Sequence, residues 1–232
     1  MKTCIAASIL ALAASASAFA PAAQQAASCT QLSETKADLE SLAAKSNPVL
    51  KYYDPLDLAS TTIWGQSNEA TIGFLRHAEI KHGRVAMAAF VGYIVQSNGI
   101  TFPWPAVGGG VGTLTGSPPE QWDALPDAAK WQIILFVGFL EWFSEAAGTH
   151  YMRGGKPGQF PRFDESKELV PHPVPIGSLY DPFGFHKNKS EEAKAAGLVK
   201  ELNNGRLAQI GIIGFLAAQK VEGSVPLLKG VV

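Results

Sequence analysis

The sequence predicts an all-α membrane protein with three transmembrane helices, of which the first and third cross about a pseudo-two-fold axis. Three observations lead to this fold. Three segments have the length of a membrane-spanning helix, basic residues gather in one of the two connections between them, and the first and third segments are copies of one motif. The 232 residues are 47% apolar and 17% charged, which suffices to bury a core or to cross a bilayer.

Composition excludes several classes of function. The formal net charge is -1 and no run of five basic residues occurs, so we expect no nucleic-acid partner. The two cysteines, Cys4 and Cys29, both precede the predicted helices and leave them without thiols for a disulfide framework, a zinc site or a nucleophile. No nucleophile and base fall in a recognisable arrangement, so we expect no enzyme.

The N-terminus is predicted to be a targeting segment. Residues 1–18 combine Lys2, an apolar run and a small-residue end, which is the layout of a secretory signal peptide. Residues 19–35 begin with Phe19 and contain few acidic residues, as transit peptides do. The pair resembles the two-part plastid address of algae with complex plastids of red-algal origin, and a plain secreted protein is the alternative. The remaining residues, 36–232, form the predicted helical domain.

The three candidate spans run from about 72 to 95, 128 to 147 and 198 to 221. Each is close to the ~20 residues that a helix needs to cross a bilayer. All three contain charged or amide side chains, so hydropathy alone favours a buried soluble helix bundle equally.

The charges of the connections favour the membrane. Residues 98–127 contain no Lys or Arg, whereas residues 150–200 contain eight basic residues. These are Arg153, Lys156, Arg162, Lys167, Lys187, Lys189, Lys194 and Lys200. By the positive-inside rule the second connection lies on the stromal side, which also places the N-terminus in the stroma and the C-terminus in the lumen.

An internal repeat relates the first and third spans. Residues 79–86, EIKHGRVA, align with residues 201–208, ELNNGRLA. A lone charge deep in a bilayer costs roughly 2.5 to 3.5 kcal/mol, so the repeated Glu and Arg need partners. Glu and Arg five residues apart point ~140° away from each other on one helix. Two-fold symmetry predicts the pairs Glu79–Arg206 and Glu201–Arg84, with Gly83 and Gly205 at the crossing.

Each paired carboxylate is predicted to keep an unused oxygen. Mg²⁺ held in a macrocycle accepts oxygen or imidazole ligands, and a carboxylate that an arginine neutralises can serve without burying net charge. His82 and Asn204 occupy equivalent places after Glu79 and Glu201, and they offer an imidazole nitrogen and an amide oxygen. The repeat thus permits four ligands. Taken alone, His82 is more often a hydrogen-bonded core histidine.

The two motifs resemble the signature of the chlorophyll-binding light-harvesting antenna family. The likeness covers roughly residues 50–225, including Asp54-Pro55-Leu56 and Asp181-Pro182-Phe183 before the first and third spans. It implies chlorophyll ligation by Glu79, His82, Glu201 and Asn204, and crossing ion pairs through Arg84 and Arg206. Two features resemble the chlorophyll a/c branch of this family: the targeting segment, and short phrases of the helical domain such as EWFSE at 141–145. That branch implies chlorophyll a, chlorophyll c and a carotenoid of fucoxanthin or peridinin type.

The middle helix matches the family less closely. It offers Glu141 as a ligand, with Gln132 and Glu145 as further candidates, and the arginine that plant members commonly carry three residues after the ligand glutamate is Ser144 here. In plant relatives a glutamine that serves as a ligand would align with Ala218 of this chain, and Gln219 is the next residue.

The resemblance also implies a thylakoid location and a function. We expect a multi-pass protein that transfers excitation to a photosystem I or II core, with other antenna subunits and thylakoid lipids as partners. Two alternatives stay open, a photoprotective member that dissipates energy and a proton-coupled transporter with intramembrane carboxylates.

Overall fold

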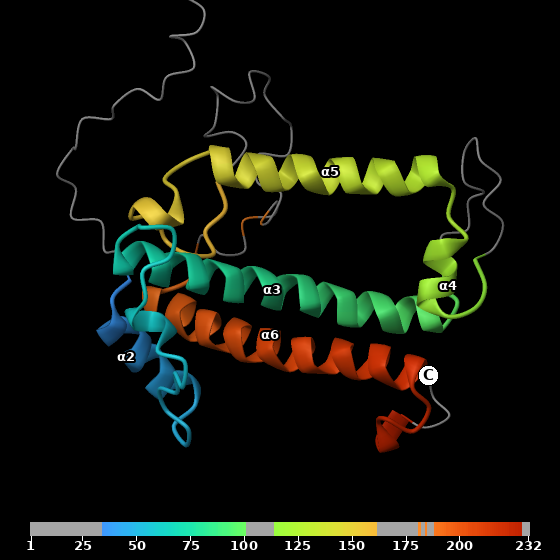
Figure 1. Cartoon of the computed structure of the whole chain (residues 1–232), viewed down its shortest axis with the longest axis horizontal. Coiled ribbons are helices and arrows are strands. Elements are labelled where there is room, and N and C mark those ends of the chain that lie inside the picture. Colours follow the sequence, from blue (N-terminus) through green and yellow to red (C-terminus); the bar gives the residue numbers. More distant parts are fainter. Residues whose placement is uncertain (1–33, 101–113, 162–180, 182–183, 185–187, 229–232) are drawn as a thin grey trace, which may run out of the picture. The chain divides into compact units, whose positions relative to one another are not determined.

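The computed structural model describes residues 34–100, 114–161, 181, 184 and 188–228. The predicted signal peptide and nearly all of the transit-like segment lie outside them, as do Pro182 and Phe183. The described residues belong to one compact unit. The described part contains α-helices, short 3₁₀ turns and no strand (Figure 1). The helices are α2 (Lys36–Ser46), α3 (Asn68–Ser97), α4 (Pro118–Asp123), α5 (Asp127–Ala146) and α6 (Glu191–Lys220), and the turns are η2 (Leu58–Ser60), η3 (Tyr151–Arg153) and η4 (Pro226–Leu228).

Helices α3 and α6 each begin several residues before the predicted apolar span. Each has 30 residues and starts at a serine N-cap. The Ser67 hydroxyl accepts a hydrogen bond from the Ala70 N–H at 3.2 Å, and that of Ser190 accepts from the Ala193 N–H at 3.3 Å. These caps satisfy N–H groups that a helix start otherwise leaves unpaired. The predicted spans 72–95 and 198–221 are therefore the apolar parts of longer helices.

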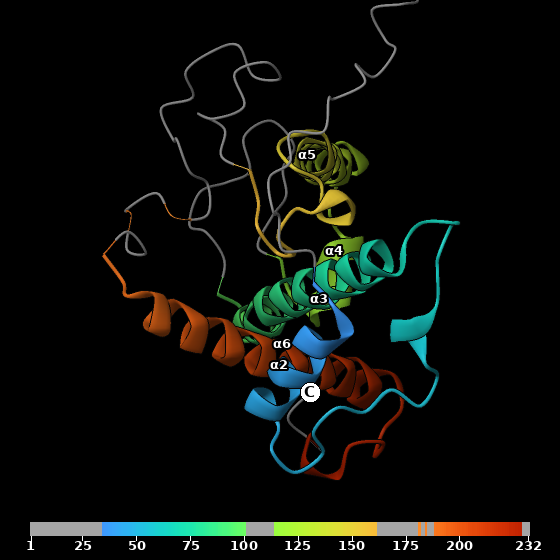
Figure 2. The ribbon, with the colours of Figure 1, turned by 90° about the vertical axis from the view of Figure 1, so that its left-hand side faces the viewer.

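Helices α3 and α6 pack along each other, and Figure 2 shows their ribbons crossing. Beyond the crossing, the ring of Phe215 in α6 stacks on Phe90 and Tyr93 of α3, with centroids 4.9 and 5.1 Å apart. Offset aromatic pairs of this kind add to the apolar area that the two helices bury. The Tyr93 hydroxyl also donates a hydrogen bond to Gln219 at 2.8 Å.

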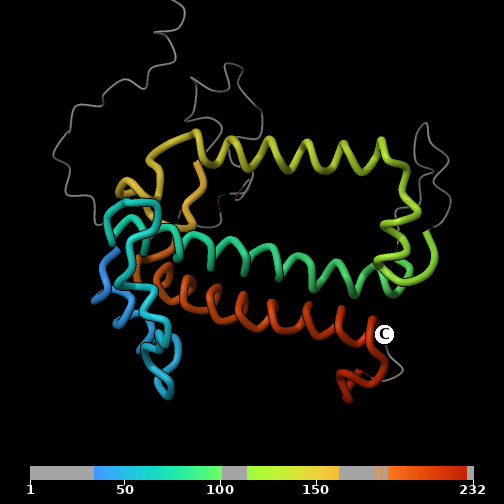
Figure 3. Tube along the Cα trace, viewed as in Figure 1, coloured from blue at the N-terminus to red at the C-terminus, as the bar shows by residue number. Residues whose placement is uncertain are grey.

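Helix α5 covers the predicted middle span almost residue for residue and is joined to α3 through α4 at one end (Figure 3). Phe143 is buried, but most large apolar side chains of α5 are exposed. Among the described residues, no helix combines the length and the apolar character that crossing a membrane requires.

The segment after α5 packs against the first turns of α3. Turn η3 contacts α3, and a Cβ on Gly73 of α3 would come within 2.6 Å of the Tyr151 carbonyl oxygen. This close approach requires glycine at that position. The segment brings Tyr151, Gly158 and Phe160 next to the charged part of α3.

Candidate functional site

Arg84 of α3 and Glu201 of α6 form an ion pair between the crossed helices. The Arg84 Nε donates to Glu201 Oε1, and both side chains are 31% exposed. Arg84 also donates to the Gly158 carbonyl oxygen at 2.7 Å, and its guanidinium lies 5.2 Å from the ring of Phe160. Glu201 Oε2 has no hydrogen-bond partner among the described residues. This carboxylate is therefore neutralised and still has an oxygen to offer.

The second pair joins Glu79 of α3 to Arg206 of α6. The Arg206 Nε and Nη2 donate to Glu79 Oε1 at 2.8 and 2.6 Å. The two partner pairs that the repeat predicts are thus both present.

The surroundings of the two pairs differ, because Arg76 donates to Glu79 Oε2 at 2.5 Å. The prediction of an unused oxygen on each glutamate is wrong for Glu79, since both of its oxygens accept hydrogen bonds. The cause is local: Arg76 lies one helical turn before Glu79, where i,i+3 side chains meet. Arg76 also pairs with Glu34 at 3.2 Å. Sequence reasoning missed Arg76 because the equivalent place in α6 is Leu198.

The two glycines of the repeat face each other at the crossing. A Cβ built on Gly205 would lie 2.9 Å from the Gly83 Cα, and one on Gly83 would lie 3.1 Å from the Gly205 Cα. Both glycines are buried. The close approach of the two backbones brings each arginine within reach of the glutamate of the other helix.

The hydrogen bond of His82 engages one nitrogen of its ring and leaves the other without a partner among the described residues. Its Nδ1 lies 2.7 Å from the Ala78 carbonyl oxygen. A carbonyl oxygen only accepts, so in the neutral ring Nδ1 carries the proton and Nε2 keeps its lone pair. The side chain is exposed on α3, and Asn204 is equally exposed on α6. Both residues are therefore accessible at a helix surface, as candidate ligands must be.

His77, five residues earlier on α3, has the opposite tautomer. Its Nδ1 accepts a hydrogen bond from the Gly158 N–H at 3.2 Å, so in the neutral ring the proton is on Nε2. The side chain is 5% exposed, and it stacks on Tyr151 with centroids 4.0 Å apart. His77 thus serves packing, and it cannot offer Nε2 as a ligand.

Helix α5 contributes two acidic residues next to α3. The Lys81 Nζ of α3 donates to Glu141 Oε2 at 2.5 Å, and the Glu141 side chain is 52% exposed. Glu145 accepts from the Tyr151 hydroxyl at 3.1 Å, has His150 Nε2 at 2.8 Å and lies 3.8 Å from the Lys81 Nζ. Glu145 is therefore tied into a polar cluster, whereas Glu141 Oε1 has no partner in the described part of the chain.

Burial and the Glu145 carboxylate act together on Tyr151. They raise the pKa of its hydroxyl from 10.0 to about 12, with burial as the larger cause. The neutral phenol is therefore the form that the fold favours.

The two remaining candidates lie apart from the crossing. Gln132 is exposed on α5. Gln219 accepts the hydrogen bond from Tyr93 described above, so its amide oxygen is already engaged. Sequence reasoning did not connect Gln219 with Tyr93, because the two residues lie on different helices.

The ligand atoms described here fit a macrocyclic Mg²⁺. Neutralised carboxylates, a lone imidazole nitrogen and an amide oxygen are its usual kinds of donor. Exposed apolar side chains surround them on the same helices, among them Val85 and Leu207. An apolar macrocycle would cover such side chains, as it would cover the apolar face of α5.

Comparison with known proteins agrees with this chemistry. The family model described as "Chlorophyll A-B binding protein" matches residues 36–220. The chain is 36% identical over 232 residues to fucoxanthin-chlorophyll a-c binding protein F of Phaeodactylum tricornutum, covering 97% of this chain and 98% of that protein. It is 33% identical over 228 residues to a fucoxanthin-chlorophyll a-c binding protein of Trieres chinensis, covering 94% and 95%.

A further relative comes from Macrocystis pyrifera. Its fucoxanthin-chlorophyll a-c binding protein B is 30% identical over 182 residues, covering 75% of this chain and 69% of that protein. All three relatives are described as chloroplastic. With the family match over residues 36–220, these findings show that the chain belongs to the chlorophyll a/b-binding family of light-harvesting antenna proteins.

Proposed function

We propose that this chain harvests light and passes the excitation to a photosystem, with chlorophyll held by Glu79, His82, Glu141, Glu201 and Asn204. Bound chlorophyll and carotenoid supply the absorption of visible light and the transfer of excitation between pigments. The protein's own residues fix where the pigments lie, neutralise the ligands and exclude water.

The state of each ligand supports this assignment. Glu201 and Glu141 each have one oxygen on a cation and the other without a partner among the described residues. His82 offers Nε2, and Asn204 is exposed. Glu79 is the most constrained ligand. Each of its oxygens accepts from an arginine, so Mg²⁺ would use a second lone pair on one of them.

The pigments are proposed from the relatives. Proteins at 33% and 36% identity over nearly the whole chain are named for fucoxanthin and chlorophylls a and c. We therefore assign chlorophyll a, chlorophyll c and a fucoxanthin-type carotenoid to this chain.

No described helix is apolar enough by itself to cross a membrane, so the placement of α3, α5 and α6 across the thylakoid membrane relies on their paired charges and on bound pigment. In this placement the N-terminus is in the stroma and residues 1–35 are the import signal. The ion pairs Glu79–Arg206 and Glu201–Arg84 would remove most of the cost of charges in the membrane. A photosystem core, other antenna subunits and thylakoid lipids are the proposed partners.

The single observation that carries the proposal is the ion pair between Arg84 and Glu201, which neutralises a carboxylate and leaves its second oxygen without a partner among the described residues. The test is reconstitution of the full chain in detergent with chlorophyll a, chlorophyll c and fucoxanthin, which keeps Glu34 beside Arg76 and the Thr35 cap of α2. We expect the excitation spectrum of chlorophyll a fluorescence to contain the chlorophyll c and fucoxanthin bands. A reconstituted protein that binds no pigment, or whose bound fucoxanthin gives no chlorophyll a emission, would contradict the proposal.

A further inference from the structure

Glu141 is the one proposed carboxylate ligand that lies outside the crossing of α3 and α6, so neither Arg84 nor Arg206 is its partner in the structure. No basic residue of α5 lies within one turn of it, since residues 137–145 contain neither Lys nor Arg. Lys130, the basic residue of α5, lies three turns away, where it pairs with Asp127. An unneutralised carboxylate at a pigment surface would be costly to desolvate.

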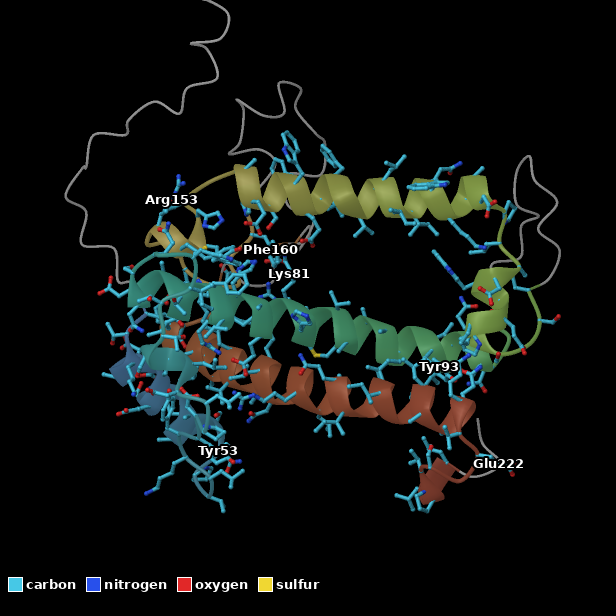
Figure 4. All side chains as sticks on the ribbon, in the orientation of Figure 1. Tyr53, Lys81, Tyr93, Arg153, Phe160 and Glu222 are labelled. Carbon is cyan, nitrogen blue, oxygen red and sulfur yellow. The ribbon has the colours of Figure 1, made fainter. Side chains whose placement is uncertain are left out.

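Lys81 of α3 supplies the missing charge. Its Nζ lies 2.5 Å from Glu141 Oε2, and its side chain is 21% exposed. The same Nζ lies 5.9 Å from the ring of Phe160, and Figure 4 shows both residues between α3 and α5. A cation held against an aromatic ring and a carboxylate has a defined position.

The arrangement at Glu141 repeats the one at Glu201. In both, a cation from a different helix holds one carboxylate oxygen and the other has no partner among the described residues. The cation belongs to α3 each time, Lys81 in one case and Arg84 in the other. The internal repeat did not indicate Lys81, because its equivalent in α6 is the neutral Asn203.

We infer that Lys81 is the positioning counter-ion of a third carboxylate ligand, and that its charge decides whether Glu141 holds chlorophyll. The inference rests on the proposed function. Lys81 is not itself a ligand: it neutralises Glu141 and holds one carboxylate oxygen, which leaves the other for the pigment. It also joins α5 to α3, so the test must separate charge from anchoring.

Five variants separate the two roles after reconstitution with chlorophyll a, chlorophyll c and fucoxanthin. Lys81→Leu should lose about one chlorophyll per polypeptide, because one ligand holds one macrocycle. Lys81→Arg should retain it. Glu141→Gln keeps an oxygen donor without charge, and Glu145, 3.8 Å from the Lys81 Nζ, still faces that cation. Both Glu141→Gln and the double variant Lys81→Leu/Glu141→Gln should therefore retain the pigment. Lys81→Leu/Ser144→Arg should regain it, because residues 141 and 144 meet at i,i+3.

Lys130→Leu is the matched control, since it removes a cation that is 22% exposed, close to the 21% of Lys81, and that is paired with Asp127 rather than with Glu141. Pigment extraction gives the chlorophyll number, and difference absorption identifies the lost band. A full complement in Lys81→Leu would overturn the inference. So would the same loss in Lys81→Leu and in Lys81→Leu/Glu141→Gln, which would make Lys81 an anchor of α5 only. If the unaltered chain binds no pigment, the proposed function fails. If it binds pigment and only the Lys81 series deviates, this inference alone fails.

Discussion

Arg206 donates two hydrogen bonds to a single oxygen of Glu79, Oε1, from the facing helix. The other oxygen accepts from Arg76 on the same helix as Glu79. The symmetry-related Glu201 accepts from Arg84 and from no second arginine in the described part of the chain. The two halves of the repeat are thus alike in pairing and unlike in surroundings.

This difference predicts unequal losses for the two arginines. Arg84→Leu leaves Glu201 without a cation, and breaking such a pair costs about 3 to 5 kcal/mol where lipid and pigment complete its burial. Arg206→Leu leaves Glu79 paired with Arg76, so we expect a smaller loss, about 1.5 to 3 kcal/mol, the worth of a hydrogen bond to a charged group. Thermal loss of the chlorophyll circular dichroism measures both. Equal losses would contradict the role of Arg76, and Arg76→Leu/Arg206→Leu should approach the larger value.

The helix crossing predicts a strong effect of one methyl group. Gly205→Ala places a Cβ about 2.9 Å from the Gly83 backbone, so the helices must separate, which costs about 1 to 3 kcal/mol. Gly214→Ala on the same helix meets nothing within 4 Å and should instead stabilise by roughly 0.5 to 1 kcal/mol. The same thermal measurement applies. Two variants of similar stability would show that the backbones do not meet at this point.

The two histidines of α3 predict different pigment contents. His82→Leu removes the free Nε2 and should lose about one chlorophyll with the fold retained. His77→Leu removes the acceptor of the Gly158 N–H, so the complex should be less stable but keep its chlorophyll number. Pigment extraction and thermal melting of both variants make the comparison. Loss of chlorophyll from His77→Leu, or a full complement in His82→Leu, would reverse these assignments.

Tyr151 predicts a pH dependence at the alkaline end. Its pKa rises from 10.0 to about 12 on folding, so the unfolded chain loses the phenol proton first. The stabilisation is complete below pH 10.0 and disappears as the pH rises towards about 12. Tyr151→Phe keeps the ring and removes this contribution. Guanidinium unfolding between about pH 9 and about pH 12 should show a steeper decline for the unaltered chain than for the variant, and identical declines would contradict the prediction.

The repeat predicted the contacts between α3 and α6 well. A charged side chain in a buried helix needs a partner of opposite charge, and the two-fold symmetry of the repeat identifies that partner on the other helix. Neither the place of the glycines nor the partner of either glutamate required a structure. Contacts made by residues that differ between the two copies of the repeat were not predicted. Arg76 aligns with Leu198 and Lys81 aligns with Asn203, so the repeat gave no indication of the contacts that these two basic residues make. The i,i+3 spacing of Arg76 and Glu79 could have revealed the first.

Helix ends and short helices were predicted less well than long apolar segments. Hydropathy detects the apolar part of a helix, whereas Ser67 and Ser190 start α3 and α6 in polar sequence. Helix α2 was not predicted, although Thr35 and Asp38 form a capping box at its start. The tautomers of His77 and His82 depend on Gly158 and Ala78, and the contact with Gly158 forms only in the folded chain.

The proposed pigment sites depend most on the pairing of Glu201 with Arg84 across the crossing. A double-mutant cycle with Glu201→Gln and Arg84→Leu, read as thermal loss of the chlorophyll circular dichroism, tests it most directly. We predict that the double variant recovers much of the loss of Arg84→Leu, because no charge is then left unpaired. Glu201→Gln with Arg206→Leu, two residues of one helix, is the control and should show no coupling. Coupling of Glu201 with Arg206 and none with Arg84 would contradict the account.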